Sequence, residues 1–222
     1  MCGRFTLAVE EGELQAEFEG IDLPSQFARR YNIAPSQPVL AVLNDGRHKA
    51  DFLVWGLIPS WAKDPSIGNR LINARAETLA EKPSFRSSYK HKRCLILADG
   101  FYEWKATAGT KSKIPHYVQL KSARPFAFAG LWAEWRNSDG SELRSCTIIT
   151  TVPNALMAPI HNRMPAILRP EDREPWLDPT ISAPEVLAPL IHPFPSNLMR
   201  AFPVSTLVNN PATDRVDCIV PA

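Results

Sequence analysis

The sequence has few of the features that would assign it at once to a common class of protein. Its 4 cysteines, at positions 2, 94, 146 and 218, form no Cys-x-x-Cys pair, which argues against a zinc site. No stretch approaches the ~18 apolar residues of a membrane-spanning helix, and the start lacks the basic and apolar regions of a signal peptide. The formal net charge of +2 provides no global field that would recruit nucleic acid. We therefore expect a cytoplasmic protein without a metal, a cofactor or a membrane partner.

The composition indicates one globular domain over residues 1–222. Hydrophobic residues make up 45% of the chain, which is enough to fill a sizeable core. The 21 prolines are about twice the usual share. Because they occur together with 10 Phe, 6 Trp and 4 Tyr, they indicate a loop-rich globule and not a disordered chain.

The hydrophobic pattern predicts mostly strands with a few short helices. Helical spacing covers residues 10–18, where Leu14 and Phe18 are four residues apart. Further helices are expected from Pro170 to Trp176 and after Pro184. The strand-like runs are residues 39–43, 52–55, 93–98, 117–120, 126–132 and 145–151, whereas residues 31–35 and 59–65 suggest loops. We predict an α+β fold in which short peripheral helices surround a curved, mainly antiparallel sheet or barrel-like core.

Cys2 is the residue whose chemistry is most informative. Removal of Met1 would leave it as the N-terminus, with an α-amine of pKa about 8 beside a thiol of pKa about 8.5. The amine can attack an aldehyde to give a Schiff base, and the thiolate can then close a thiazolidine ring. With an amide substrate, the thiolate alone could serve as an acyl-transfer nucleophile. Small residues often follow the initiator methionine, so this start alone does not establish a catalytic role.

Two further stretches place polar residues among apolar ones. Asn73 and Arg75 share one face of an extended segment, where an amide and a guanidinium could hold a phosphate, or Arg75 could simply pair with Glu77. Glu103 lies between Tyr102 and Trp104, and desolvation by aromatic side chains would raise its pKa toward the range useful for proton transfer. An edge-strand glutamate facing water is the alternative for Glu103.

A third polar stretch lies between Pro159 and Pro165. These prolines fix a loop that presents His161 and Arg163. Histidine is the natural acid–base group near pH 7, although a single loop histidine can also be structural.

These stretches occur together with Cys2 in the order of one known family. The motifs are Met-Cys-Gly-Arg-Phe, Asn-Ala-Arg-x-Glu-Thr, Ala-Asp-Gly-Phe-Tyr-Glu-Trp and Ile-His-x-Arg-Met-Pro, with further matches at residues 31–35, 55–61 and 204–209. Across nearly its whole length the chain closely resembles the SOS-response-associated peptidase family, whose members are abasic-site-processing proteins. The resemblance implies loss of Met1, which can be autocatalytic, and covalent capture of abasic sites in single-stranded DNA by Cys2.

The resemblance also implies roles for individual residues. Asn73 would hold the Cys2 reaction centre, Glu103 would exchange protons as the Schiff base forms, and His161 would help to open the sugar ring. The expected DNA contacts are Arg4, Asn32, Pro35, Trp61, Arg75, Thr150 and Arg163, with the protein acting as a monomer. Some bacterial relatives carry two consecutive tryptophans where this chain has Trp61-Ala62, which leaves the preferred DNA context open.

Two other functions are compatible with the same residues. Glutamine amidotransferases with an N-terminal nucleophile also begin Met-Cys-Gly, but they typically carry an Asn-Gly pair that this sequence lacks. A noncatalytic nucleic-acid-binding module, in which Cys2 is incidental, would bind reversibly and with strong salt dependence. If Met1 stayed attached, the thiazolidine route would be closed.

Overall fold

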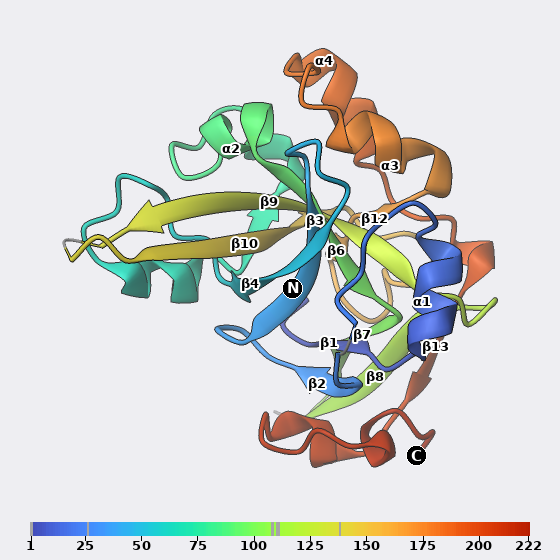
Figure 1. The fold of residues 1–222 in the computed structure, drawn as a ribbon. Helices are drawn as coiled ribbons and strands as arrows, with labels where there is room; N and C mark the ends of the chain where they lie inside the picture. The colour runs from blue at the N-terminus through green and yellow to red at the C-terminus, as the bar shows by residue number, and fades with distance from the viewer. Residues whose placement is uncertain (1, 26, 108, 110–111, 138) are drawn as a thin grey trace.

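The structure is a computed structural model that describes residues 2–25, 27–107, 109, 112–137 and 139–222 (Figure 1). Its centre is a closed ring of strands. Around the ring the pairing runs β10–β4–β3–β6–β9, and β9 pairs back with β10. The ring strands are β3 (Pro38–Leu43), β4 (Ala50–Trp55), β6 (Arg93–Ala98), β9 (Phe126–Arg136) and β10 (Glu142–Thr151). This confirms the α+β prediction with a barrel-like core.

Continuous apolar sequence explains why the ring strands are central. All six residues of β6 are buried, as are the first eight of β9. Strands covered on both faces lose the alternation of apolar and polar residues and become runs of apolar side chains. Every pairing in the ring is antiparallel except that of β10 with β4. The expected mainly antiparallel arrangement is therefore observed.

A second sheet of five antiparallel strands adjoins the ring. Its order is β13–β8–β7–β1–β2. The strands are β1 (Phe5–Leu7), β2 (Arg30–Ile33), β7 (Gly100–Ala106), β8 (Lys113–Leu120) and β13 (Met199–Pro203). Only Asp99 separates β6 from β7, so the chain passes directly from the ring into this sheet. The second sheet carries Glu103 on β7 and places Cys2 just ahead of β1.

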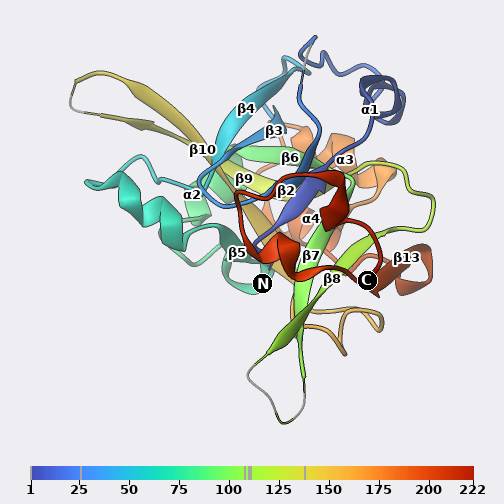
Figure 2. The same ribbon diagram turned by 90° about the horizontal axis from the view of Figure 1, so that it is seen from below.

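Short elements cover the outside of the two sheets (Figures 1 and 2). The helices are α1 (Glu11–Glu17), α2 (Arg86–His91), α3 (Pro170–Leu177) and α4 (Pro184–Leu187). Short strands are β5 (Asn73–Arg75), β11 (Met164–Pro165) and β12 (Ile167–Leu168), and 3-10 turns span residues 65–70, 76–78, 188–190, 196–198, 206–209 and 216–218. No helix among the described residues is long and apolar enough to cross a membrane.

The described residues match most of the sequence-based elements, with one correction. Residues 31–35 were predicted as a loop, but Arg30–Ile33 form β2 beside β1. The sequence gives no clear signal for this strand, because a register irregularity interrupts its pairing with β1 and because a side chain accepts hydrogen bonds from two of its backbone amides. The carboxylate of Asp214 accepts hydrogen bonds from the backbone amides of Tyr31 and Asn32. Such a long-range partner leaves no local signal.

Replacing Gly100 with alanine should strongly destabilise the fold. An added Cβ would lie 2.1 Å from the hydroxyl oxygen of Tyr117, which is buried and hydrogen-bonded to Thr6. Overpacking of this kind costs about 1–3 kcal/mol or more, measured as a lower urea midpoint. Gly12→Ala in α1 is the control, since nothing lies within 4 Å of its Cβ position, and it should stabilise by about 0.5–1 kcal/mol. Equal midpoints for the two variants would contradict this assignment.

Candidate active site

Strand register brings Cys2 and Glu103 to the same end of the second sheet. Phe5 lies opposite Phe101, and the amide of Tyr102 donates to the carbonyl of Arg4 at 3.0 Å. Because the strands are antiparallel, the chain before Phe5 runs alongside the chain after Phe101. Cys2 is fully buried, with its Sγ 3.6 Å from the carbonyl oxygen of Arg4.

Asn73 contacts Cys2 from β5, a short strand beside the ring. Its strand β5 pairs in parallel with β10, with Asn73 opposite Ile148. The Asn73 Nδ2 donates to the carbonyl oxygen of Cys2 at 2.8 Å. Its Oδ1 is buried and accepts no hydrogen bond from a described residue. Asn73 thus holds the Cys2 backbone and still presents an acceptor that an amine or hydroxyl at the site could use.

Glu103 is a buried carboxylate with electrostatic links to two other candidate residues. It is 2% exposed, and this burial raises its pKa above the ordinary glutamate value, an effect that the nearby charge of His161 partly offsets. Burial also raises the pKa of the Cys2 thiol, and the charge of Glu103 raises it further. The structure therefore brings Cys2, Glu103 and His161 within electrostatic reach of one another.

The loop around His161 controls which ring nitrogen carries a proton. The backbone N–H of Arg163 donates to His161 Nδ1 at 3.1 Å, so the neutral ring holds its proton on Nε2. The carbonyl oxygen of Arg163 lies 3.3 Å from the same Nδ1 and can accept a hydrogen bond from Nδ1–H of the charged ring. The backbone of Arg163 thus fixes the Nδ1 side of the His161 ring.

The other predicted contact residues divide into exposed and buried groups. Arg75 and Trp61 are exposed, the latter at 58%, and Pro35 is partly exposed. Asn32 and Thr150, which were expected to line a groove, are both 0% exposed. Their polar groups serve hydrogen bonds inside the fold, so in this structure neither side chain reaches a surface where DNA could touch it.

Arg163 and Arg4 are both committed to partners within the protein. Arg163 forms a bidentate ion pair with Glu77, at 2.6 and 2.9 Å, and donates to the carbonyl of Thr150 at 2.5 Å. Glu77 therefore pairs with Arg163 and not with Arg75, the partner that the sequence offered as the alternative. Arg4 is partly buried and donates to Asn32 and to two backbone carbonyls.

Comparison with known proteins places this chain in a family. The model of the SOS response associated peptidase (SRAP) family matches residues 1–211. The chain is 49% identical to the abasic site processing protein YoqW of Bacillus subtilis over 99% of both chains. It is 33% identical to the rat abasic site processing protein HMCES, over 90% of this chain and 67% of that protein. The chain belongs to the SRAP family. A crystal structure of a protein from Bacteroides thetaiotaomicron is 28% identical and aligns over both full chains with a TM-score of 0.88.

The residue beside the exposed Trp61 of this SRAP protein is Ala62, which is buried. Its carbonyl accepts a hydrogen bond from the indole of Trp135 at 2.7 Å. The Trp135 indole therefore packs against the backbone at this point, and Trp61 presents a single ring to solvent.

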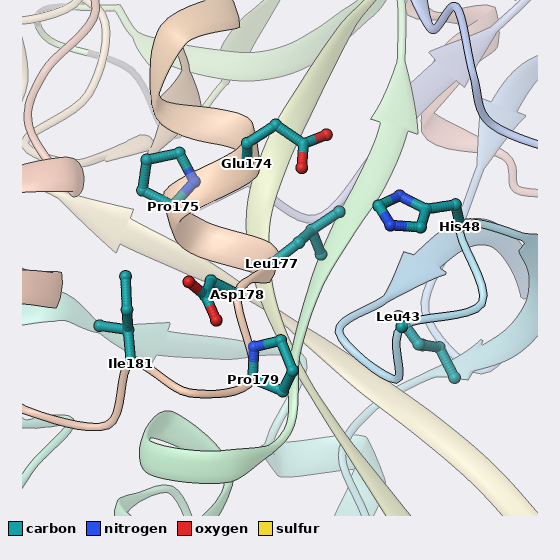
Figure 3. A pocket seen from close by; sticks show the side chains of 9 residues that line it. Leu43, His48, Glu174, Pro175, Leu177, Asp178, Pro179 and Ile181 are labelled. Carbon is teal, nitrogen blue, oxygen red and sulfur yellow. The ribbon is translucent and has the colours of Figure 1, made fainter.

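The SRAP chain also has a pocket of about 450 Å³ that none of the predicted site residues lines (Figure 3). It lies between the turn after β3 and the end of α3, and it combines the carboxylates of Glu174 and Asp178 with apolar side chains such as Leu43 and Leu177. Among the described residues, no three His, Cys, Asp or Glu side chains converge as metal ligands would.

Proposed function

We propose that this SRAP protein captures abasic sites in single-stranded DNA by forming a thiazolidine with Cys2 after loss of Met1. The observation that carries the proposal is the convergence of Cys2, Asn73, Glu103 and His161 from four separate parts of the chain. The names of the relatives support abasic-site processing as the general activity. An opened abasic deoxyribose carries an aldehyde, the electrophile for which an adjacent amine and thiol are suited.

The proposed reaction begins with hydrolysis of the Met1–Cys2 peptide bond, which the protein itself would catalyse and which frees the α-amine. His161 in its charged form donates its Nε2 proton to the ring oxygen of the sugar, and the C1 hydroxyl loses its proton to water as the aldehyde opens. The amine adds to the aldehyde carbon, and the resulting carbinolamine loses one water to give the Schiff base. Glu103 exchanges the protons of these steps, for which a raised carboxyl pKa is an advantage. Asn73 keeps the Cys2 backbone in place.

Ring closure completes the link. The Cys2 sulfur adds to the Schiff-base carbon, and the thiol proton ends on the nitrogen. Because burial keeps this thiol neutral, it is protected from other electrophiles until condensation of the adjacent amine delivers a carbon to it. The product would shield the lesion. Reversal of ring closure and strand scission by β-elimination from the Schiff base are side activities that we propose for the same intermediate.

The test is intact-mass measurement before and after incubation with a single-stranded oligonucleotide that carries one abasic site. We expect protein without Met1, followed by a mass gain of one oligonucleotide less one water. An oligonucleotide with a tetrahydrofuran abasic analogue has no aldehyde and should give no adduct. A Met1-free protein that forms no covalent species would overturn the proposal. Hydrolysis of glutamine by the protein would then indicate an amidohydrolase. Equal, reversible binding of the two oligonucleotides would indicate a noncatalytic binding module.

We further propose that the protein works as a monomer in the cytoplasm, on the nucleoid if the source is a bacterium. One chain supplies all four residues of the candidate site, so the proposed reaction requires no second copy.

A further inference from the structure

Residues 204–218, here called the C-terminal segment, pack beside β2 and β7 at the end of the chain (Figures 1 and 2). Val204, Val208 and Cys218 of this segment are buried against Tyr102 of β7 in a hydrophobic cluster of their own. The indole of Trp104 donates to Asn209 Oδ1 at 2.7 Å. The segment is therefore fixed against the strand that carries Glu103.

The C-terminal segment also holds Arg4, two residues from Cys2. Arg4 Nη1 donates to Asn32 Oδ1 at 2.9 Å and to the carbonyl of Val208 at 2.6 Å, and Nη2 donates to the carbonyl of Asn209 at 3.4 Å. A guanidinium has five N–H donors, and these bonds use three of them. The Nε hydrogen and one Nη2 hydrogen are not bonded to any described residue. The Nε–Nη2 edge of a guanidinium can grip a phosphate with two parallel hydrogen bonds.

The charge of Arg4 is not neutralised within the described part of the protein. All three of its acceptors are neutral oxygens, and no carboxylate of a described residue forms an ion pair with it. Arg163 differs in this respect, since Glu77 neutralises it through a bidentate pair. Of these two arginines, Arg4 is therefore the better suited to meet a phosphate close to Cys2.

Asn32 connects Arg4 to the C-terminal segment. Its Nδ2 lies 3.2, 3.0 and 2.7 Å from the carbonyl oxygens of Val208, Asn210 and Thr213. These acceptors determine the orientation of the amide, because the opposite orientation would point its oxygen at three carbonyls. The Asn32 Oδ1 is left facing Arg4. The side-chain oxygen of Asn32 is thus a buried hydrogen-bond acceptor, and the carbonyls of the C-terminal segment determine that it faces Arg4.

We propose that Asn32 and the Val208 carbonyl are positioning groups that hold Arg4 with its Nε–Nη2 edge toward a DNA phosphate beside the captured lesion. The C-terminal segment is then part of the DNA-binding site, although Val208 lies 204 residues from Arg4 in sequence. This inference rests on the proposed function for the identity of the ligand. It assigns Asn32 an indirect role in place of the direct DNA contact expected from the sequence.

A double-mutant cycle tests the proposal, with Arg4→Ala, Asn32→Ala and the double variant. The probe is a single-stranded oligonucleotide with a tetrahydrofuran abasic analogue, so that only reversible binding is measured. Arg4→Ala should weaken binding about tenfold and reduce the slope of log K against log salt by about 0.7, the value for one lost phosphate contact on a single strand. Asn32→Ala should weaken binding by a similar factor, with no further loss in the double variant. Losses that multiply in the double variant would overturn the positioning role, since a purely structural effect of Asn32 does not depend on Arg4.

Arg4→Lys provides a second test that leaves Asn32 in place, in case Asn32→Ala fails to fold. Lysine retains the positive charge but cannot donate two parallel hydrogen bonds to one phosphate. Binding should therefore weaken several-fold, while the slope of log K against log salt stays near that of the wild type. If Arg4→Lys bound with wild-type affinity, the proposal that Arg4 grips a phosphate through an oriented guanidinium edge would be wrong. The adduct of the wild-type protein with a natural abasic site is measured separately. If it forms while the mutant cycle is additive, only the positioning proposal fails; if it does not form, the covalent function fails whatever the cycle shows.

Discussion

Replacing Cys2 with serine should eliminate the heat-stable protein–DNA adduct. Serine keeps the α-amine and nearly the same volume at a fully buried position, so the fold should change little. The amine can still form a Schiff base, which water reverses. The hydroxyl is a far weaker nucleophile than the thiol and would not lock the carbon into a stable ring. The expected loss is complete within the sensitivity of a denaturing gel of heated samples.

The Cys2→Ser experiment separates the two chemical steps of the proposal. Intact mass must first show that Met1 is absent from the variant, because an acylated amine could form neither product. Borohydride, which reduces Schiff bases, should then trap the Met1-free serine variant on an abasic oligonucleotide. Cys146→Ser is the matched control, since it also places a hydroxyl at a fully buried free cysteine, and it should retain the adduct. A heat-stable adduct on Cys2→Ser at the wild-type level would rule out ring closure by the thiol.

The ring was predictable from the sequence because its strands are continuous apolar runs. Residues 93–98 form β6 with the predicted bounds, and the runs at 126–132 and 145–151 lie inside the longer β9 and β10. The strands of the second sheet gave weaker signals. β1 has three residues and β2 has four, and both depend on partners elsewhere in the chain for their pairing. Local sequence cannot supply that information.

The sequence predicted which residues belong to the candidate site better than it predicted how they are arranged. The motifs pointed to Cys2, Asn73, Glu103 and His161. The β1–β7 and β5–β10 pairings position the first three, and His161 lies within electrostatic reach of Glu103 from its loop. The sequence could not show that Asn32 is buried, because its burial depends on carbonyls from Val208 to Thr213. Polar residues whose partners are 170 or more residues away look like surface residues until the fold is known.

Replacing Glu103 with glutamine should slow adduct formation by about 10²–10⁴-fold, the usual contribution of a positioned acid–base group. Glutamine has nearly the same shape but cannot exchange a proton with the amine or the carbinolamine. The affinity for the tetrahydrofuran oligonucleotide, which needs no proton transfer, should change little. The measurement is the single-turnover rate of adduct formation, with the exposed Glu19→Gln as a charge-matched control. Equal rates for Glu103→Gln and the wild type would remove Glu103 from the mechanism.

The same substitution should make the folded protein more stable near neutral pH. Burial raises the pKa of Glu103, so between its unfolded and folded pKa values the native state binds more protons than the unfolded state. The free energy of unfolding of the wild type therefore falls as pH rises through this window, which begins near the ordinary glutamate pKa of about 4.3. Glu103→Gln removes that loss, so its Tm should exceed that of the wild type at pH 7 and the difference should shrink toward pH 4. A variant that is both slower and more stable would show that the fold tolerates a buried carboxylate at Glu103 for the sake of the reaction. A Tm difference that does not vary with pH would contradict the raised pKa on which the proton-transfer role depends.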